Sequence, residues 1–375
     1  MVHYLEHGSI QSEMSPCRLR NFREEGTRME RRNYAGGGRA AQYIGGGDIA
    51  VVENPIPEPG EGEVRIKVAF CGICGTDLHI LHGNMDHRVS VPQAIGHEMS
   101  GTVDAVGVGV TSVAPGDGAT VMPLDWCGEC PACLAGHQHI CQNLDFVGIE
   151  TTGAMQQYWV VPESVVVPLP AGLALDHAAL IEPLAVAAHD VRRSRLIAGE
   201  TAVIIGGGPI GQLISLVARG AGASVILAEP NADRRAFAER HGARVVNPID
   251  ENLAEIVEEA TDGAGADVVF EVAGIAPTAL EAPRLARTRG RVVMVAIHPQ
   301  PVPIDLHRVF WRELELLGAR VYEREDFDRA IEVLASGQIP ADELITRRVP
   351  LADTKLAFDD LTDARALKVL IDVQN

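Results

Sequence analysis

The chain has 375 residues, and at roughly 100–200 residues per domain this length predicts two or three domains. Its net charge of −19 would repel a phosphate backbone, and an aromatic content of 4% offers little surface for base stacking, which argues against a nucleic-acid partner. The sequence has no run of about 18 apolar residues, so we expect no membrane-spanning helix.

Residues 1–35 form a polar segment rich in both arginine and glutamate. It lacks the apolar core of a secretory signal, and its glutamates are unlike a transit peptide. Such a segment buries too little apolar surface to fold. We therefore expect either a disordered extension or a start assigned upstream of a true start at Met29.

Residues 36–183 are rich in glycine and proline and contain short apolar runs. Val64–Val68 and Tyr158–Val161 are examples, and turn residues separate them. This pattern predicts a domain of mostly antiparallel β-strands.

Three polar clusters in this domain could form an open zinc site. They are Cys71, Cys74, Thr76, Asp77 and His79 in the first, His97 and Glu98 in the second, and Glu182 in the third. Each residue alone is a weak signal, because a single histidine or glutamate usually has an ordinary polar role. Together they supply a thiolate, an imidazole and carboxylates, which suit a zinc ion with one open position.

Four cysteines form the most specific pattern in the chain: Cys127, Cys130, Cys133 and Cys141. Four thiolates satisfy tetrahedral zinc completely, so we expect a structural zinc in a lobe spanning residues 124–145. An iron–sulfur cluster uses the same ligands, but nothing else in the sequence indicates electron transfer. An odd total of seven cysteines, clustered in this way, argues against disulfides and predicts a reducing, cytoplasmic location.

From residue 184 to 318 strands and helices alternate, which predicts an α/β domain with a doubly wound parallel sheet. The expected strands are 201–205, 224–228, 244–246, 267–272 and 291–297, and the expected helices include 210–219 and 232–241. The last segment, 319–375, contains a predicted helix at 327–335 and a terminal strand at 366–371.

A glycine-rich turn after the first of these strands fits the dinucleotide fingerprint G-x-G-x-x-G. Gly206 permits the tight turn, Gly208 lets the backbone approach a pyrophosphate, and Gly211 lets helix and strand pack closely. The N-terminus of the following helix offers free N–H groups to the phosphates.

Glu229 ends the next strand at the spacing that this fingerprint requires. Its carboxylate can bind the ribose hydroxyls and would repel a 2′-phosphate, so NAD is predicted over NADP. Arg234 and Arg235, just downstream, leave some tolerance of NADP open.

These motifs resemble those of the zinc-containing medium-chain dehydrogenases, in particular the branch with sorbitol, 2,3-butanediol and threonine dehydrogenases. The resemblance runs from about residue 40 to the C-terminus and rests on CGICGTDLH (71–79), IGHEMSG (95–101), the four-cysteine lobe, IEPLAV (181–186) and GGGPIG (206–211). It implies a GroES-like catalytic domain at 36–183, a Rossmann domain at 184–318, and a segment at 319–375 that returns to the catalytic domain.

The resemblance also implies roles for individual residues. Cys74 and His97 match zinc ligands, while Glu98 and Glu182 match two zinc-proximal carboxylates, either of which ligates directly or through water. Thr76 and His79 match a proton relay, Asp77 matches the acid behind the metal, and Cys71 matches no ligand. The implied cofactor contacts are Gly206, Gly208, Pro209, Ile210, Gly211, Glu229, Arg234, Val295 and Ile297.

The expected function is zinc-dependent transfer of hydride from a secondary alcohol, vicinal diol or polyol to NAD, which gives the ketone. Two zinc ions per chain, one catalytic and one structural, and a homodimer or homotetramer are expected from the resemblance. Ile80 and Val321-Tyr322 depart from the sorbitol dehydrogenase pattern, whereas CGTDLH is more like threonine dehydrogenases.

Three alternatives remain open. One is an L-threonine 3-dehydrogenase-like activity. Another is a zinc-independent quinone or enone reductase, against which the set of Cys74, His97 and Glu182 argues. The third is a dinucleotide-binding regulator without catalysis, against which Thr76 and His79 argue.

Overall fold

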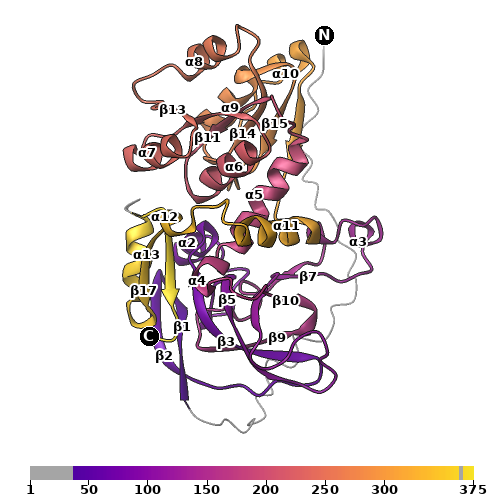
Figure 1. Cartoon of the computed structure of the whole chain (residues 1–375), viewed down its shortest axis with the longest axis vertical. Coiled ribbons are helices and arrows are strands. Elements are labelled where there is room, and N and C mark those ends of the chain that lie inside the picture. Colours follow the sequence, from indigo (N-terminus) through magenta and orange to yellow (C-terminus); the bar gives the residue numbers. More distant parts are fainter. Residues whose placement is uncertain (1–36, 363–365) are drawn as a thin grey trace, which may run out of the picture.

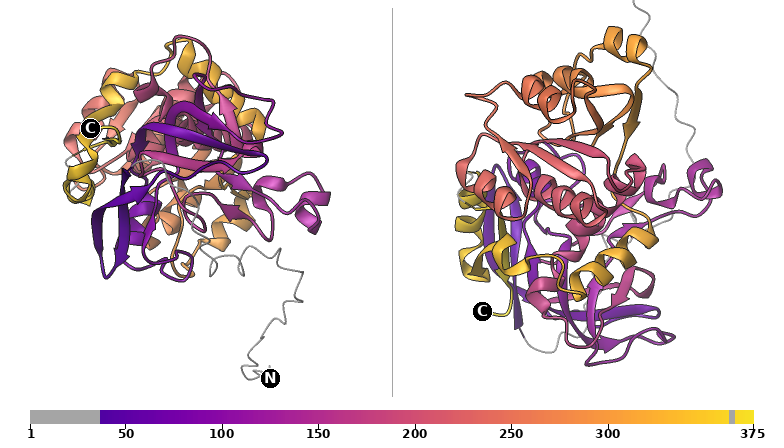
Figure 2. Two further views of the ribbon diagram at one scale, coloured as in Figure 1. Left: turned by 90° about the horizontal axis from the view of Figure 1, so that it is seen from below. Right: turned by 45° about the horizontal axis from the view of Figure 1, so that its top comes forward.

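The computed structural model describes residues 37–362 and 366–375, so the expected extension at 1–35 lies outside the described residues. The described chain forms two halves, and helix α5 (Ile181–Ser194) runs from one into the other (Figure 1; Figure 2). One half is built on a six-stranded parallel sheet and the other on mostly antiparallel sheets. The predicted fold class, a Rossmann-type sheet with a GroES-like β domain, is confirmed.

The antiparallel half contains a seven-stranded sheet in the order β10-β6-β5-β3-β18-β17, with β9 also paired to β3, and a three-stranded sheet in the order β2-β1-β4. Its strands are β1 (Gly37–Gly45), β2 (Asp48–Pro55), β3 (Glu63–Gly72), β4 (Gln93–Ala94), β5 (Glu98–Val106), β6 (Gly118–Val121), β9 (Tyr158–Pro162), β10 (Val166–Pro168), β17 (Ile345–Pro350) and β18 (Lys368–Asp372). Its helices are α2 (Gly75–Leu81), α4 (Leu175–Ala178), α12 (Ala341–Leu344) and α13 (Thr354–Thr362).

Strand β3 shows why this half folds as a sheet. Val64, Ile66 and Val68 are buried while Lys67 between them is exposed, which is the period of two of a strand with one face on the core. The last strand, β18, pairs antiparallel with β3, so the C-terminal segment returns to this sheet.

The parallel half has the strand order β13-β12-β11-β14-β15-β16, which is the doubly wound order of dinucleotide-binding proteins. Its strands are β11 (Thr201–Ile205), β12 (Ser224–Ala228), β13 (Arg244–Val246), β14 (Ala266–Glu271), β15 (Ala286–Met294) and β16 (Glu315–Gly318). Its helices are α6 (Pro209–Gly220), α7 (Ala232–Arg240), α8 (Leu253–Ala260), α9 (Ala276–Leu285) and α10 (Leu306–Arg312).

Six predicted elements have different ends in the structure, among them β14, α6, α11 (Arg324–Ala335) and β18, whose ends shift by one to three residues, and the two that follow. Strand β15 ends at Met294, so residues 295–297 belong to the loop that follows it. Helix α7 ends at Arg240 rather than His241, because Gly242 adopts a φ of +84° that turns the chain out of the helix.

The junction of the two halves is built from α5 and α11 (Arg324–Ala335), which pack against each other. The expected domain boundary at residues 183 and 184 falls inside α5, so it stays a prediction. A small lobe beside this junction contains β7 (Leu124–Asp125), α3 (Pro131–Leu134), the 3-10 helix η1 (Gln138–Ile140) and β8 (Asp145–Phe146). None of the helices in the described part of the chain combines the length and apolarity that a membrane crossing needs.

Candidate functional site

Helix α2 carries the first group of predicted site residues and lies where the two halves meet (Figure 1). Cys74 is its N-cap residue, in an extended conformation, and the Cys74 backbone N–H donates to Asp77 Oδ2 at 2.8 Å. The Asp77 side chain is fully buried, and its Oδ1 has no hydrogen-bond partner among the described residues. Asp77 therefore fixes the turn that presents the Cys74 thiol.

Strand pairing brings Cys74 to the second cluster. Glu98 begins β5 directly after His97, and Glu98 pairs with Gly72 at the end of β3, two residues before Cys74. The ligand atoms of Cys74, His97 and Glu98 consequently all lie within 4.8 Å of one another, whereas Glu182 is not in this group. A sulfur, a nitrogen and a carboxylate oxygen at this spacing suit a zinc ion that keeps one open position.

Negative charge is concentrated around His97, which is 2% exposed. Burial lowers its pKa, but a hydrogen bond to Cys74 and the charges of Cys74 and Asp77 outweigh that effect and raise its pKa to about 10. The pKa of Glu182 rises to about 7, mainly because its carboxyl is buried. The acidic groups around His97 repel one another when they are ionised. A cation would relieve this repulsion, so the electrostatics of the site also fit a metal ion.

Lys368 belongs to this site, and the sequence analysis did not include it. Its ammonium is buried at the start of β18, donates to the Ile73 carbonyl at 3.0 Å and forms an ion pair with Glu98 Oε2. Burial lowers the pKa of Lys368, yet the charge of Glu98 prevails and raises it. A lysine inside the apolar terminal run 366–371 was the available signal in the sequence.

Tyr322 is the second residue that sequence reasoning missed as a site residue. Its side chain is fully buried, and its hydroxyl donates to Glu182 Oε1 at 2.8 Å. Glu182 lies in the first turn of α5 and Tyr322 lies just before α11, so this bond connects the starts of both helices. It holds the Glu182 carboxylate in place beside His97.

The two predicted relay residues lie on α2 after Cys74. Thr76 and His79 are both partly exposed, and their spacing of three places them on one face of the helix. Both residues follow Cys74 closely along the chain, and their role as a proton relay stays a prediction.

The four cysteines of the lobe converge as free thiols: Cys127, Cys130, Cys133 and Cys141. The Sγ of Cys141 lies 3.7 Å from that of Cys130 and 3.5 Å from that of Cys127, close to the roughly 3.8 Å between two sulfurs on one tetrahedral zinc. Backbone N–H groups of Cys133 and Gln142 point at Cys130 Sγ and lower the pKa of that thiol to about 6. This site therefore fits a structural zinc ion.

The glycine-rich turn lies at the carboxyl end of β11 and opens α6, which is the context that the fingerprint requires. Gly206 has a φ of +107°, and a Cβ on Gly211 would lie 1.9 Å from the Gly206 carbonyl oxygen. Gly208 is the N-cap of α6, and Pro209 and Ile210 form its first turn, so the first amides of the helix remain free for a phosphate.

Glu229 lies against this turn at the end of β12 and is 5% exposed. Its carboxylate accepts the Gly207 N–H at 2.7 Å and the Asn231 N–H at 2.8 Å. Arg235 donates to the carbonyls of Glu229 and Pro230, so its guanidinium is engaged by the backbone. The Nε of Arg234 is buried and has no partner among the described residues.

The predicted contacts Val295 and Ile297 lie in the loop after β15, at the same carboxyl edge of the sheet. The Val295 N–H donates to the Glu271 carbonyl at 3.0 Å. A Cβ on Gly274 would lie 3.5 Å from the Ile297 carbonyl oxygen, and one on Gly206 would lie 3.0 Å from the Ala273 nitrogen. The loop after β14 therefore adjoins the glycine-rich turn, and the loop after β15 adjoins the loop after β14.

The chain matches two protein-family models and is similar to known dehydrogenases. The model of the alcohol dehydrogenase GroES-like domain matches residues 60–171, and that of the zinc-binding dehydrogenases matches residues 209–336. The 2-dehydro-3-deoxy-L-galactonate 5-dehydrogenase of Pseudoalteromonas atlantica is 55% identical over 334 residues, which cover 89% of this chain and 98% of that protein. The L-threonine 3-dehydrogenase of Pyrococcus abyssi is 39% identical over 305 residues, which cover 80% of this chain and 87% of that protein.

A similar solved structure is that of a zinc-binding dehydrogenase from Sinorhizobium meliloti bound to NADP. It has a TM-score of 0.86 and 37% sequence identity, and the match covers 90% of this chain and 100% of that chain.

Proposed function

The chain belongs to the zinc-binding alcohol dehydrogenases, and on that premise we propose that it oxidises a secondary hydroxyl of a polyol or sugar acid to the ketone with zinc and NAD. The observation that carries the proposal is the grouping of Cys74, His97 and Glu98 within 4.8 Å at the start of α2. In the same chain, the glycine-rich turn before α6 offers a dinucleotide site.

The residues of the chain have separate tasks in this reaction. Zinc held by Cys74, His97 and Glu98 would supply Lewis-acid chemistry that lowers the pKa of an alcohol, while NAD supplies the hydride acceptor. The Thr76 hydroxyl would take the proton of the substrate hydroxyl, and His79 would pass it to solvent.

Two further contacts preserve the shape of the site. Lys368 places its ammonium against the Glu98 carboxylate, so this buried carboxylate has a charged partner. Tyr322 fixes Glu182 in one position, so that the second carboxylate can contact the metal directly or through water.

NAD is the proposed cofactor because of Glu229. Its buried carboxylate stands at the end of β12 beside the glycine-rich turn, where a 2′-phosphate would bring a second negative charge. Arg235, one of the two arginines just downstream, already donates to two backbone carbonyls. The proposal includes two zinc ions per chain and a cytoplasmic location, which the free thiols of the described cysteines support.

A carboxylate-bearing substrate is proposed from two neighbouring arginines, Arg88 and Arg320. Arg88 pairs with Glu150 at 2.5 Å, and the pKa of Arg320, whose side chain is exposed, is lowered by partial loss of hydration and by the charge of Arg88. Two guanidinium groups that share one carboxylate leave a positive charge for an anionic substrate group. Arg320 lies two residues before Tyr322, whose hydroxyl bonds Glu182. The similar enzyme of Pseudoalteromonas atlantica is named for an L-galactonate derivative, which is a sugar acid.

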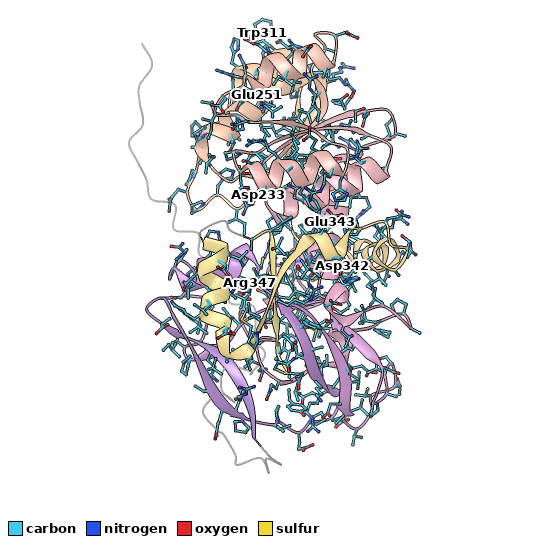
Figure 3. The ribbon with its side chains drawn as sticks, turned by 60° about the vertical axis from the view of Figure 1, so that its left-hand side comes forward. Asp233, Glu251, Trp311, Asp342, Glu343 and Arg347 are labelled. Carbon is cyan, nitrogen blue, oxygen red and sulfur yellow. The ribbon has the colours of Figure 1, made fainter. Side chains whose placement is uncertain are left out.

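A homo-oligomer is also part of the proposal. Strand β16 pairs only with β15 within the described residues and forms the edge of the parallel sheet. Helix α10 beside it leaves Phe310 73% and Trp311 67% exposed, and Figure 3 shows Trp311 at the outer end of this half. An open strand edge next to exposed aromatic side chains suits a second copy of the chain. Light scattering should give a multiple of the monomer mass, and Trp311→Glu should lower it.

The test of activity is an NADH-absorbance screen of alditols, aldonates, 3-deoxy-2-keto aldonates, 2,3-butanediol and L-threonine, with NAD and NADP. We expect the highest rate with a sugar acid and NAD, and its loss in Cys74→Ala but not in the matched variant Cys71→Ala. Arg320→Gln should raise KM for the acid more than for an uncharged polyol, whereas Arg324→Gln, whose partner Asp328 lies on the surface, should not.

Other results of the screen would refute the proposal. Highest activity on L-threonine would favour the threonine dehydrogenase-like alternative. A zinc-replete protein that is inert on the whole panel with both cofactors would exclude the proposed reaction, and zinc found only at the four cysteines would favour a zinc-independent reductase.

A further inference from the structure

A second set of ligand-type side chains lies where the four-cysteine lobe meets α5 and α11. His189 on α5 and Glu323 and Asp326 at the start of α11 have ligand atoms within 4.8 Å of one another. His139, in η1 of the lobe, places its Nδ1 3.6 Å from Glu323 Oε1, and its ring centroid lies 5.2 Å from that of His189. Figure 1 shows the lobe, marked by α3, beside α11.

We propose that His139, His189, Glu323 and Asp326 form a third metal site, which takes a first-row divalent transition ion such as Zn²⁺. Two imidazoles with two carboxylates are a common donor set for such ions, whereas Mg²⁺ and Ca²⁺ prefer oxygen ligands throughout. None of the four residues belongs to the proposed catalytic site or to the four cysteines, so the site is additional to both.

His139 supplies an observation that is independent of the cluster itself. Its side chain is only 10% exposed, and its Nδ1 is buried without a hydrogen-bond partner among the described residues. The distance of 3.6 Å to Glu323 Oε1 is too long for a hydrogen bond between them. A buried, unpaired ring nitrogen is costly, and an ion between these two atoms would satisfy both.

The charges around the cluster favour a cation. Arg192 contacts Asp326 at 2.6 Å, Glu325 at 2.7 Å and also Glu323, so one guanidinium faces three carboxylates. Asp190 next to His189 adds no charge to this count, because burial and the charge of Asp326 raise the pKa of its carboxyl well above the usual value. The pocket thus holds more negative than positive charge before an ion enters.

Arg192 leaves room for an ion to enter. It bonds Oε2 of Glu323, while Oε1 of the same carboxylate faces His139 and stays available. The Arg192 side chain is 43% exposed and borders a groove of about 840 Å³ between α5, α6 and α11. For Asp326 to bind the ion, the guanidinium must turn towards solvent, and the ion must replace the bond of 2.8 Å between His189 Nδ1 and Asp326 Oδ2.

A bound ion would link the lobe to two helices at once. The first turn of α5 carries Glu182, and Tyr322 directly precedes Glu323, so both lie close along the chain to residues of the cluster. Occupation of the third site should therefore stabilise the junction and raise Tm in a saturable way.

The experiment is equilibrium dialysis of the zinc-loaded enzyme against Zn²⁺, with the bound zinc per chain counted by mass spectrometry. We expect one further ion per chain at saturation, and binding at least about tenfold weaker in Glu323→Gln and in His139→Gln. Glu325→Gln removes another carboxylate from the same Arg192 and should bind the ion like the wild type. His137→Gln, a change in the same lobe, should do so as well.

Two results would overturn the proposal. One is a zinc content that does not rise above the resting value up to about 1 mM Zn²⁺. The other is an added ion that all four variants bind as tightly as the wild type. If His139→Gln loses the structural zinc, the lower resting zinc content reveals this, and Glu323→Gln alone then decides. Zinc counting does not depend on turnover. A failure of the third metal site is therefore distinguishable from a failure of the proposed dehydrogenase activity.

Discussion

The replacement Lys368→Met should destabilise the protein through the charge it leaves behind. Lys368 and Glu98 are 3% and 2% exposed, so water cannot replace the lost ammonium as the partner of the Glu98 carboxylate. Removal of one partner from a buried ion pair costs about 3–5 kcal/mol. Methionine has a similar volume and leaves little cavity, so the unpaired charge dominates the loss.

Thermal unfolding followed by circular dichroism at fixed zinc concentration measures this cost. A unit of 150–250 residues loses about 2–4 °C in Tm per kcal/mol, so Lys368→Met should lower Tm by at least about 6 °C. The double variant Glu98→Gln/Lys368→Met removes both charges and should regain at least half of that loss. The exposed Lys67→Met, on neighbouring β3, is the matched control.

Two outcomes would refute the reasoning. If Lys368→Met and Lys67→Met lowered Tm equally, the buried pair would contribute nothing specific. If the double variant were less stable than Lys368→Met while both held the same amount of zinc, the loss would come from packing rather than from an unpaired charge.

Three other predictions concern charge and zinc. Burial alone raises the pKa of Asp326, but bonds from Arg192 hold this pKa far below its usual value. The ionised Asp326 therefore stabilises the folded state fully above about pH 4, which is the usual pKa of aspartate, and this contribution is lost as pH falls further. Between about pH 7 and pH 3, the Tm of Asp326→Asn should fall less than the Tm of the wild type. Equal falls in Tm would contradict this role of Asp326. Glu229→Gln keeps an acceptor for the backbone but removes the charge, so the ratio of kcat/KM for NADP to that for NAD should rise at least about tenfold; an unchanged ratio would argue against this role. Cys130→Ser should lower Tm and should lower the zinc content by one ion per chain. Cys71→Ala should retain all of the zinc.

Local patterns in the sequence were enough to predict the parts of the molecule whose determinants are close together along the chain. The structure has β11, β12 and β13 at the predicted residues, and the signal is clearest in β11 and β12, because strands buried on both faces read as continuous apolar runs. The convergence of the four cysteines was predictable for the same reason, since Cys127 and Cys141 are only 14 residues apart. The glycine-rich turn likewise carries its own constraint in Gly206 and Gly211.

The tertiary structure alone decided what surrounds each predicted residue. Glu98 meets Lys368 across 270 residues, and Glu182 meets Tyr322 across 140, because β18 pairs with β3 and α11 packs on α5. Apolar periodicity shows that a side chain is buried but does not show which element covers it. The sequence therefore determined the fold class and candidate ligands, while the neighbours of those ligands followed only from the packing of distant strands and helices.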